Sequence, residues 1–413
     1  RVWPHPTVVS SRRSGAGAPR DGAAFLAPAS HSPAGRAGPR ATGSSMSKLP
    51  ATERLLLGPG PSPVSPRVLR AMLAPSLSHL DPDMMALLAD VSARVGRVFR
   101  APADHFSFAV SGTGSAGLEA VVANLVREGT SVVALVNGYF GDRLASVCER
   151  MGGRVRRVTG DWGRALDPEA LRGALREGGA DLVAMVHAET STGVRNPVEA
   201  LCAIARESGA WTIVDTVTSL GAMPVDVASW QADGVYSCTQ KGLGAPSGMA
   251  PVTFSARAVE QARRRPGRSF YFDLGLLQDY WTARKYHHTI SAPLVYAVRE
   301  ALLIVEEEGL EARWARHERN HLALVAGLAE LGLDLLPPAG ERLWTLNAVR
   351  VPDGVDEAAV RRTLLERFDI EIGAGLGPLA GRVWRVGLMG HGSSEAVVLL
   401  LLAALRQALP HRD

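Results

Sequence analysis

The sequence has 413 residues, of which 46% are hydrophobic and 21% are charged, and its formal net charge is +4. Residues 1–45 contain six arginines and one acidic residue, so this segment carries the positive charge and the remaining chain has a net charge of −1. The folded part therefore lacks the basic excess of nucleic-acid-binding proteins, and its length is sufficient for a large core and two or three domains.

Three cysteines, Cys148, Cys202 and Cys238, lie far apart in the chain. Their odd number and wide spacing fit neither a disulfide framework nor a zinc site, so we expect a reducing compartment, the cytoplasm. The longest apolar run, residues 396–405, is half as long as a membrane-spanning helix and predicts a buried C-terminal helix. We therefore expect neither a nucleic acid nor a membrane as a partner.

Residues 1–45 are rich in Ala, Gly, Pro, Ser and Arg and show neither helical nor strand periodicity. We interpret this segment as a disordered leader or a non-native extension, because Met46 begins the part of the chain that has the composition of a folded protein. An organelle transit peptide is less favoured, since the many prolines and glycines oppose an amphipathic helix.

From residue 55 the chain alternates between apolar strands and helices. Ser65 and Pro66 predict the start of a short helix that ends at Met72. Such alternation, with nearly continuous apolar strands, is typical of a mostly parallel sheet covered by helices on both faces. The predicted strands are 107–111, 131–136, 181–187, 212–215 and 234–241, and the predicted helices between them are 115–126, 142–151 and 197–207.

Beyond residue 291 the pattern changes to long amphipathic helices that extend to about residue 331. A strand at 343–351, a helix at 357–368, a strand at 382–387 and the C-terminal helix follow. This order of elements predicts a smaller α+β domain at the C-terminus.

Ligands of open parallel sheets bind beyond the carboxyl ends of the strands, so the residues at those ends are the candidates for chemistry. The sequence Ser-Gly-Thr-Gly-Ser at 111–115 connects a strand to a helix, where small residues and the helix N-terminus can bind a phosphate. Gly112, Gly114 and Gly117 also match a dinucleotide-binding motif. The next strand, however, ends at Asn137 and not at an acidic residue, which argues against a nicotinamide cofactor.

Two further strand ends offer a flat face and hydroxyl groups. Phe140 follows the strand at 131–136 and can stack on a heterocycle, although an ordinary core aromatic is a comparable interpretation. Thr190 lies in the segment Glu-Thr-Ser-Thr-Gly at 189–193, where hydroxyl groups are concentrated. We expect both residues at the same edge of the sheet.

Asp215 and Lys241 are the most informative pair in the sequence. Asp215 ends an apolar strand, and Lys241 enters a glycine-rich turn after the next strand. Pyridoxal phosphate needs such a pair, because an amine forms an imine with its aldehyde and a carboxylate keeps its pyridine nitrogen protonated. On these two residues alone, a surface lysine and a strand-end aspartate are an equally good interpretation.

The ordered combination of motifs resembles the class V, fold-type-I pyridoxal-phosphate-dependent aminotransferases, and within them the alanine–glyoxylate and serine–pyruvate (serine–glyoxylate) group. The resemblance extends from about residue 55 to residue 409. The matching stretches are Leu57-Gly58-Pro59-Gly60-Pro61, Ser111-Gly112-Thr113-Gly114, Asn137-Gly138, Ser191-Thr192-Gly193, Val214-Asp215, Ser219-Leu220-Gly221, Gln240-Lys241, Tyr286-His287-His288-Thr289, Gly375-Leu376-Gly377-Pro378 and Arg385-Val386-Gly387-Leu388.

This resemblance implies the fold of pyridoxal-phosphate-dependent transferases of type I, with a mostly parallel seven-stranded sheet, helices on both faces and a smaller C-terminal α+β domain. It divides the chain after the leader into an N-terminal arm over 46–70, a large cofactor-binding domain over 71–305 and a small domain over 306–413.

The resemblance also implies roles for single residues. Lys241 would carry pyridoxal phosphate, Asp215 would pair with its pyridine nitrogen, and Phe140 and Val217 would lie on opposite faces of its ring. Arg385 would clamp the substrate, because a planar guanidinium binds a carboxylate through two parallel hydrogen bonds. The remaining implied contacts are Thr113, Gly114, Ser115, Thr190 and Gln240 to the cofactor and Gly60 to the substrate.

By the same resemblance, Tyr286 and Thr289 would contact the cofactor phosphate of a neighbouring subunit, which implies a homodimer. His287 and His288 lie between them, but consecutive residues seldom face one ion and no third ligand is evident. We therefore expect packing or a supporting role for the two histidines, and no metal site.

The resulting hypothesis is a ping-pong transamination between a small L-amino acid, alanine or serine, and glyoxylate or another short 2-oxoacid, with Lys241 as the proton carrier. Ureidoglycine–glyoxylate and aminoethylphosphonate aminotransferases are the alternatives on the same fold. A cysteine desulfurase is disfavoured, because Gln240 stands where a histidine is required and Cys238 is predicted to lie in a strand. A noncatalytic cofactor-binding regulator is disfavoured because the lysine is intact.

Overall fold

The computed structural model describes residues 53–410, so the leader predicted at residues 1–45 lies outside the described part of the chain. No helix among the described residues is long and apolar enough to cross a membrane.

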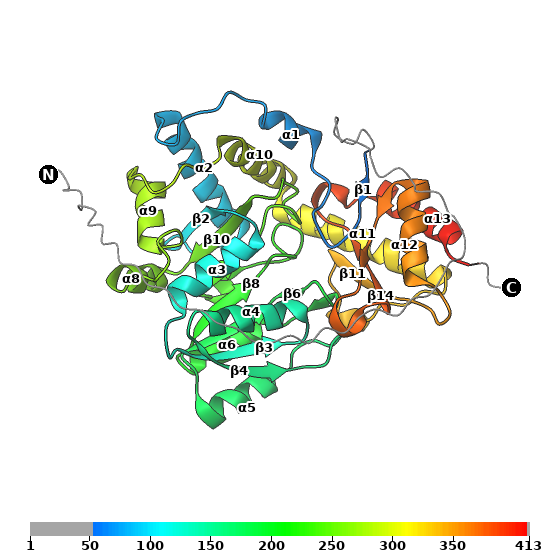
Figure 1. Cartoon of the computed structure of the whole chain (residues 1–413), viewed down its shortest axis with the longest axis horizontal. Helices are drawn as coiled ribbons and strands as arrows, with labels where there is room; N and C mark the ends of the chain where they lie inside the picture. Colours follow the sequence, from blue (N-terminus) through cyan, green and yellow to red (C-terminus); the bar gives the residue numbers. More distant parts are fainter. Residues whose placement is uncertain (1–52, 411–413) are drawn as a thin grey trace, which may run out of the picture. The chain divides into compact units, whose positions relative to one another are not determined.

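A seven-stranded sheet with the order β2-β10-β9-β8-β5-β3-β4 lies within the largest hydrophobic core. Figure 1 shows its strands among the helices α2 to α10. β10 runs antiparallel to both of its neighbours, and the other adjacent strands are parallel. Every residue of β5, β9 and β10 is buried, which requires cover on both faces because successive side chains point to opposite sides. The predicted mostly parallel α/β fold is confirmed. The strands are β2 (Phe106–Ser111), β3 (Ser131–Val136), β4 (Arg154–Thr159), β5 (Leu182–Val186), β8 (Trp211–Asp215), β9 (Gly234–Tyr236) and β10 (Met249–Phe254).

Many helices begin where the sequence supplies a polar cap and a proline. Ser65 accepts a hydrogen bond from the Arg67 N–H (3.3 Å) at the start of α1, and Asp81 accepts one from the Asp83 N–H (2.8 Å) at the start of α2. The helices are α1 (Pro66–Ala71), α2 (Pro82–Val98), α3 (Gly114–Leu125), α4 (Tyr139–Arg150), α5 (Pro168–Gly178), α6 (Val198–Glu207), α7 (Val227–Trp230), α8 (Ala256–Arg264), α9 (Leu274–Ala283), α10 (Ala292–Glu308), α11 (Leu310–Glu330), α12 (Glu357–Phe368) and α13 (Glu395–Ala408).

The C-terminal part builds a second, separate core. Its antiparallel three-stranded sheet has the order β11-β14-β13 and packs against α11, α12 and α13 (Figure 1). This arrangement is the expected smaller α+β domain. The predicted boundary after residue 305 falls inside α10, and it stays a prediction. The strands are β11 (Leu346–Arg350), β13 (Gly373–Ala374) and β14 (Val383–Gly387).

The segment before α1 connects the two cores. Its strand β1 (Leu55–Leu56) pairs in parallel with β12 (Ile370–Glu371), and the Leu57 carbonyl accepts a hydrogen bond from the Gly387 N–H (2.8 Å). The chain then turns at Gly60, and Ser62 donates its N–H to the Gln240 carbonyl (2.9 Å). The arm therefore lies directly beside Lys241.

Two predicted boundaries were wrong in ways that affect the site. The strand predicted at 234–241 ends at Tyr236, so Cys238 and Lys241 lie in the following loop and not in a strand. The helix predicted to begin at Asp142 begins at Tyr139, so Phe140 lies in its first turn.

Several elements have no counterpart in the predicted pattern. β4, with the sequence Arg-Val-Arg-Arg-Val-Thr, is the last strand of the sheet and is only half buried, so it lacks the apolar run expected of an interior strand. β10 contains Pro251, which argues against an interior strand in a sequence. The helices α2, α5, α7, α8 and α9 were also not predicted.

Candidate active site

A single pocket contains most of the residues that the sequence indicated. It lies at the carboxyl ends of β2 and β8, and the space not filled by protein atoms, including its open mouth, is about 810 Å³. It is lined by Pro59, Gly60, Thr113, Gly114, Ser115, Leu118, Phe140, Arg143, Thr190, Asp215, Val217, Tyr236, Gln240, Lys241, Leu376 and Arg385.

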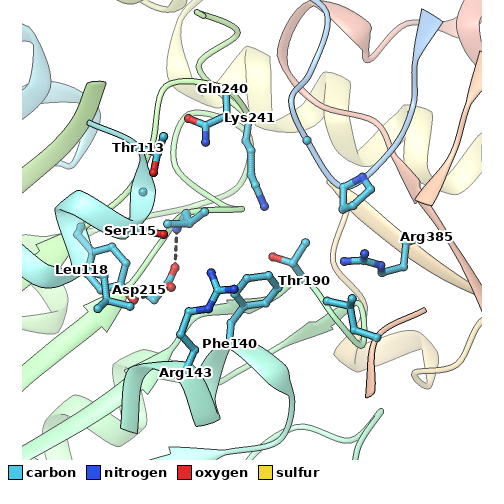
Figure 2. A pocket seen from close by; sticks show the side chains of 16 residues that line it. Thr113, Ser115, Leu118, Phe140, Arg143, Thr190, Asp215, Gln240, Lys241 and Arg385 are labelled. Atoms are coloured by element: carbon cyan, nitrogen blue, oxygen red, sulfur yellow. Dashed lines mark hydrogen bonds between the residues drawn. The ribbon is translucent and has the colours of Figure 1, made fainter. Parts of the chain in front are cut away.

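Lys241 extends into this pocket from a loop that is fixed at several points (Figure 2). The Ser62 hydroxyl donates to the Lys241 carbonyl (2.9 Å), and Arg313 donates to the Gly242 carbonyl (2.8 Å). The lysine is 7% exposed, and its Nζ donates to the Thr218 hydroxyl (3.0 Å). Burial lowers the pKa of Lys241 because an ammonium loses hydration there. The amine is therefore buried, oriented and unlike a surface lysine.

Asp215 ends β8 at the bottom of the pocket and is 4% exposed. One carboxylate oxygen accepts a hydrogen bond from the Val217 N–H (2.7 Å), and the other accepts one from the Tyr236 hydroxyl (2.7 Å). Burial raises the pKa of Asp215 to about 6, against the opposing effect of these two hydrogen bonds. The acid is held rigidly, with its oxygens toward the pocket.

The turn before α3 leaves hydrogen-bond donors free. Within residues 53–410, the backbone N–H groups of Gly114 and Ser115 donate to no protein acceptor, and the Thr113 side chain does not cap the helix. Gly112 makes the turn possible, since its φ is +134° and a Cβ there would lie 2.4 Å from the Ala116 Cβ. Two free N–H groups at a helix N-terminus can bind an anion such as a phosphate.

Gln240 lies beside this turn in the pocket lining. Its Oε1 atom is buried and has no hydrogen-bond partner among the described residues. A buried amide oxygen without a partner is unusual in a folded protein, and this oxygen can accept a hydrogen bond from a ligand that carries a donor.

The Phe140 ring is placed by the start of α4. The buried Glu189 carboxylate accepts hydrogen bonds from the N–H groups of Gly141 (3.0 Å) and Phe140 (3.4 Å), and the Ser191 hydroxyl accepts one from the Tyr139 N–H (2.9 Å). Negative charge at a helix N-terminus is favourable. Lys241 Nζ lies 5.9 Å from the centre of the Phe140 ring, so the ring faces the amine (Figure 2).

Arg385 enters the pocket from β14, on the side opposite the turn at 112–115 (Figure 2). It is 7% exposed and donates one hydrogen bond, from Nε to the Ala374 carbonyl (2.7 Å). No carboxylate within the described residues forms a salt bridge with it. Burial lowers the pKa of Arg385 to about 10, which leaves it charged at neutral pH. A buried guanidinium without an acidic partner is a site for an anionic ligand.

The pocket is also lined by Gly60, Thr190 and Val217. Of these three residues, Gly60 lies against the Lys241 side chain. A Cβ at Gly60 would lie 3.1 Å from both Cε and Cγ of Lys241. Thr190 is buried and contacts the Thr218 hydroxyl. Among the predicted residues, Gly60 is therefore distinguished by its closeness to the amine-bearing side chain.

Tyr286 and Thr289 do not line the pocket. Tyr286 is 60% exposed, and Thr289 is exposed as well. Between them, His288 accepts or donates a hydrogen bond at the Ser111 hydroxyl (3.1 Å), next to the turn at 112–115. Within residues 53–410, no group of three His, Cys, Asp or Glu side chains could hold a metal ion.

The sequence did not single out Tyr236, Thr218, Glu189 or Arg143. The pairing of β8 with β9 brings Tyr236 and Thr218 into the site. Glu189 belongs to the site because its carboxylate accepts a hydrogen bond from the first turn of α4. Arg143 lines the pocket mouth, with its guanidinium carbon 5.3 Å from the Phe140 ring centre. The sequence could have indicated Arg143, because it lies one helical turn after Tyr139 and therefore on the same side of α4. The predicted helix began at Asp142, so it did not include Tyr139.

Residues 55–386 match the family model described as aminotransferase class-V. The chain belongs to this family. An alanine–glyoxylate aminotransferase from Nostoc sp. has a crystal structure that is similar to this chain, with a TM-score of 0.85 and 45% identity, over 88% of this chain and 98% of that one. The (S)-ureidoglycine–glyoxylate transaminase of Bacillus subtilis is 37% identical over 86% of this chain and 90% of its own length. The alanine–glyoxylate aminotransferase of Drosophila melanogaster is 35% identical over 86% and 92%.

This class V aminotransferase thus has the fold and the reaction type that its motifs predicted. Membership of the family implies pyridoxal phosphate as the cofactor, and the pocket fits that group. It contains a buried amine, an acid at its base and two free N–H groups at a helix N-terminus.

Proposed function

We propose that this aminotransferase moves the amino group of a small L-amino acid, alanine or serine, to glyoxylate or another short 2-oxoacid. One observation carries the proposal: the buried Lys241 amine, the Asp215 carboxylate and the unpaired Arg385 guanidinium line one pocket. The relatives named for glyoxylate support that acceptor.

In this proposal the residues of the pocket divide between cofactor and substrate. Lys241 would hold pyridoxal phosphate covalently, Asp215 would face its pyridine nitrogen, and Phe140 and Val217 would enclose its ring. The phosphate would bind the turn at 113–115 and Gln240, and Thr190 would contact the ring. When bound, the cofactor supplies an electron sink that stabilises negative charge at the substrate α-carbon.

Lys241 Nζ would take the proton from the substrate α-carbon and return it later. Its lowered pKa favours this role, because a neutral amine is required to accept the proton at neutral pH. Arg385 would bind the α-carboxylate with the guanidinium nitrogens that have no protein partner, and so orient the C–H bond toward the amine. Gly60 would leave room for a short side chain.

A homodimer is part of the proposal. Tyr286 and Thr289 are exposed and lie outside the pocket of their own chain, which is what a contact to a second copy's cofactor phosphate requires. We also retain the cytoplasm as the compartment, since all three cysteines are free and buried.

(S)-Ureidoglycine is the second candidate donor, because the Bacillus subtilis relative named for it is 37% identical over most of this chain. The exposed guanidinium of Arg143 at the pocket mouth is suited to a donor with a carbonyl group beyond its α-carbon. This substrate would also use glyoxylate as the acceptor.

The test uses the purified full-length chain with pyridoxal phosphate. Borohydride reduction followed by peptide mass mapping should attach the cofactor to Lys241 and leave Lys285, which is exposed and paired with Asp279, unmodified. L-Alanine, L-serine and (S)-ureidoglycine are then added separately, and the cofactor absorbance is followed before and after glyoxylate. The best donor should remove the yellow band, and glyoxylate should restore it. Labelling at another lysine, or a band that no donor changes, would refute the proposal.

A further inference from the structure

The Lys241 amine has a specific resting place in the protein. Its Nζ donates to the Thr218 hydroxyl (3.0 Å), and Thr218 in turn shares a short hydrogen bond with the Thr190 hydroxyl. Thr218 is 0% exposed and Thr190 is also buried. Within residues 53–410, the amine has neither a second hydrogen-bond partner nor a salt bridge. A neutral hydroxyl is thus its single polar contact.

The two hydroxyls are arranged in series behind the amine. Thr190 lines the pocket, whereas Thr218 does not, so the chain of contacts runs from the amine through Thr218 and back to the pocket at Thr190. Figure 2 shows Lys241 and Thr190 pointing toward the same space. Asp215, which begins the same loop as Thr218, directs its oxygens to Val217 and Tyr236 and leaves the amine to the threonine.

A threonine pair suits an amine that repeatedly gains and loses a proton. Each hydroxyl can donate one hydrogen bond and accept others, so the pair can reverse its direction. A charged amine donates to Thr218, which donates to Thr190. A neutral amine can instead accept from Thr218, which accepts from Thr190. A carboxylate in the same place would stabilise only the charged form and would oppose the base function of the lysine.

We propose that Thr218 is a positioning residue that holds the Lys241 amine whenever it is not covalently bound, and that Thr190 orients the Thr218 hydroxyl for this task. The inference rests on the proposed function, because that function requires the lysine to be released from the cofactor during each cycle. Thr218 keeps the free amine beside the substrate and does so in both of its protonation states.

The experiment compares Thr218→Val, which removes the hydroxyl at constant shape, with Thr218→Ser, which keeps it. Thr253→Val is the matched control, because Thr253 is equally buried and its hydroxyl accepts a hydrogen bond from Ser107 (2.7 Å) outside the pocket. Thermal unfolding of the three variants shows whether each one is folded.

The first readout does not depend on turnover. Full-length protein freed of cofactor is mixed with pyridoxal phosphate, and the addition of the lysine amine to the aldehyde, with loss of one water, is followed by absorbance across pH. We expect Thr218→Val to lower the apparent pKa of this reaction by about one pH unit, because the ammonium loses a hydrogen-bond acceptor. Thr218→Ser and Thr253→Val should match the wild type.

The second readout is a single turnover with α-deuterated L-alanine. Thr218→Val should slow proton transfer about tenfold and increase the deuterium isotope effect, because a poorly held amine makes this step limiting. Thr218→Ser should restore both values.

A Thr218→Val variant that equals the wild type in both readouts would overturn the inference. Failure of a folded Thr218→Ser variant to restore them would also overturn it, because packing and not the hydroxyl would then be responsible. These results differ from failure of the proposed function, in which the wild-type protein itself forms no bond with the cofactor.

Discussion

The charged groups on the two sides of the pocket differ in their hydrogen-bond partners within the protein. On the large sheet, the Asp215 carboxylate receives hydrogen bonds from Val217 and Tyr236, both at 2.7 Å. On the small sheet, the Arg385 guanidinium donates one hydrogen bond to a backbone carbonyl and has no acidic partner among the described residues. Both oxygens of Asp215 therefore accept hydrogen bonds from the protein, whereas most N–H groups of Arg385 remain free to bind a ligand.

This difference agrees with the proposed function, in which Asp215 faces a resident cofactor and Arg385 binds a substrate that leaves in each cycle. A group that must hold a resident cofactor in one orientation benefits from fixed protein partners. A group that must bind and release a substrate in every cycle needs donors that no side chain already occupies. Four measurements test this difference between the two charged groups.

Lys241→Ala tests the residue that lies between the two sides. Turnover should fall at least about 10³-fold, because both the covalent attachment and the proton carrier are lost. Lys285→Ala, which changes an exposed lysine paired with Asp279, should leave the rate unchanged. The measurement is the initial rate with L-alanine and glyoxylate. A Lys241→Ala enzyme that keeps a tenth of the wild-type rate would contradict the assignment.

Arg385→Gln tests the available charge. The ratio kcat/KM should fall about 100-fold for the donor and for the oxoacid alike, since both carry the carboxylate that the guanidinium binds. Arg382→Gln is the control, because Arg382 is exposed and lies outside the pocket. If the loss is confined to one of the two substrates, Arg385 is not the common carboxylate site.

Asp215→Asn tests whether the Asp215 carboxylate is desolvated. The quantity compared is the pH dependence of the unfolding free energy of the cofactor-free protein. Burial raises the pKa of folded Asp215 from 3.8 to about 6, so its stabilising contribution is full below pH 4 and is lost as the pH rises through 6. Asparagine carries no such penalty. The unfolding free energy of the variant should therefore gain about 3 kcal/mol on that of the wild type between pH 4 and pH 7. Urea unfolding measures this gain, and a difference that is independent of pH would show that Asp215 is not desolvated.

Gly60→Ala tests how closely the N-terminal arm approaches the amine. Gly60 has a φ of +109° and a Cβ there would lie 3.1 Å from the Lys241 side chain, whereas Gly129 has a φ of +81° and open space around it. Both alanine variants should lose about 1 kcal/mol of stability through backbone strain. Gly60→Ala alone should also reduce kcat, by about tenfold, because it displaces the lysine. Equal activities in the two variants would mean that the arm does not restrict Lys241.

Much of the fold and the site could be predicted from local patterns. Strand β3 and helix α12 have the predicted bounds, because an unbroken apolar run and a capped amphipathic stretch each determine their own structure. Asp215 and Lys241 were indicated by the apolar strand that Asp215 ends and by the glycine-rich turn that follows Lys241, but only the combination with the other motifs favoured a cofactor site over an ordinary aspartate and lysine. The strands β4 and β10 could not be predicted in this way. An arginine-rich edge strand and a strand that contains a proline lack the apolar pattern that is typical of buried strands.

From the sequence alone, the family and the alternation of strands and helices could be predicted, and Lys241, Asp215 and Arg385 could be proposed as the amine, the acid and the guanidinium of the site. The folded structure was needed to see that Tyr236 donates a hydrogen bond to Asp215, that Glu189 accepts one from the Phe140 N–H and that Thr218 accepts one from the Lys241 amine. These contacts join residues of different strands and loops. Their geometry depends on which strands become neighbours, and no local periodicity records that choice.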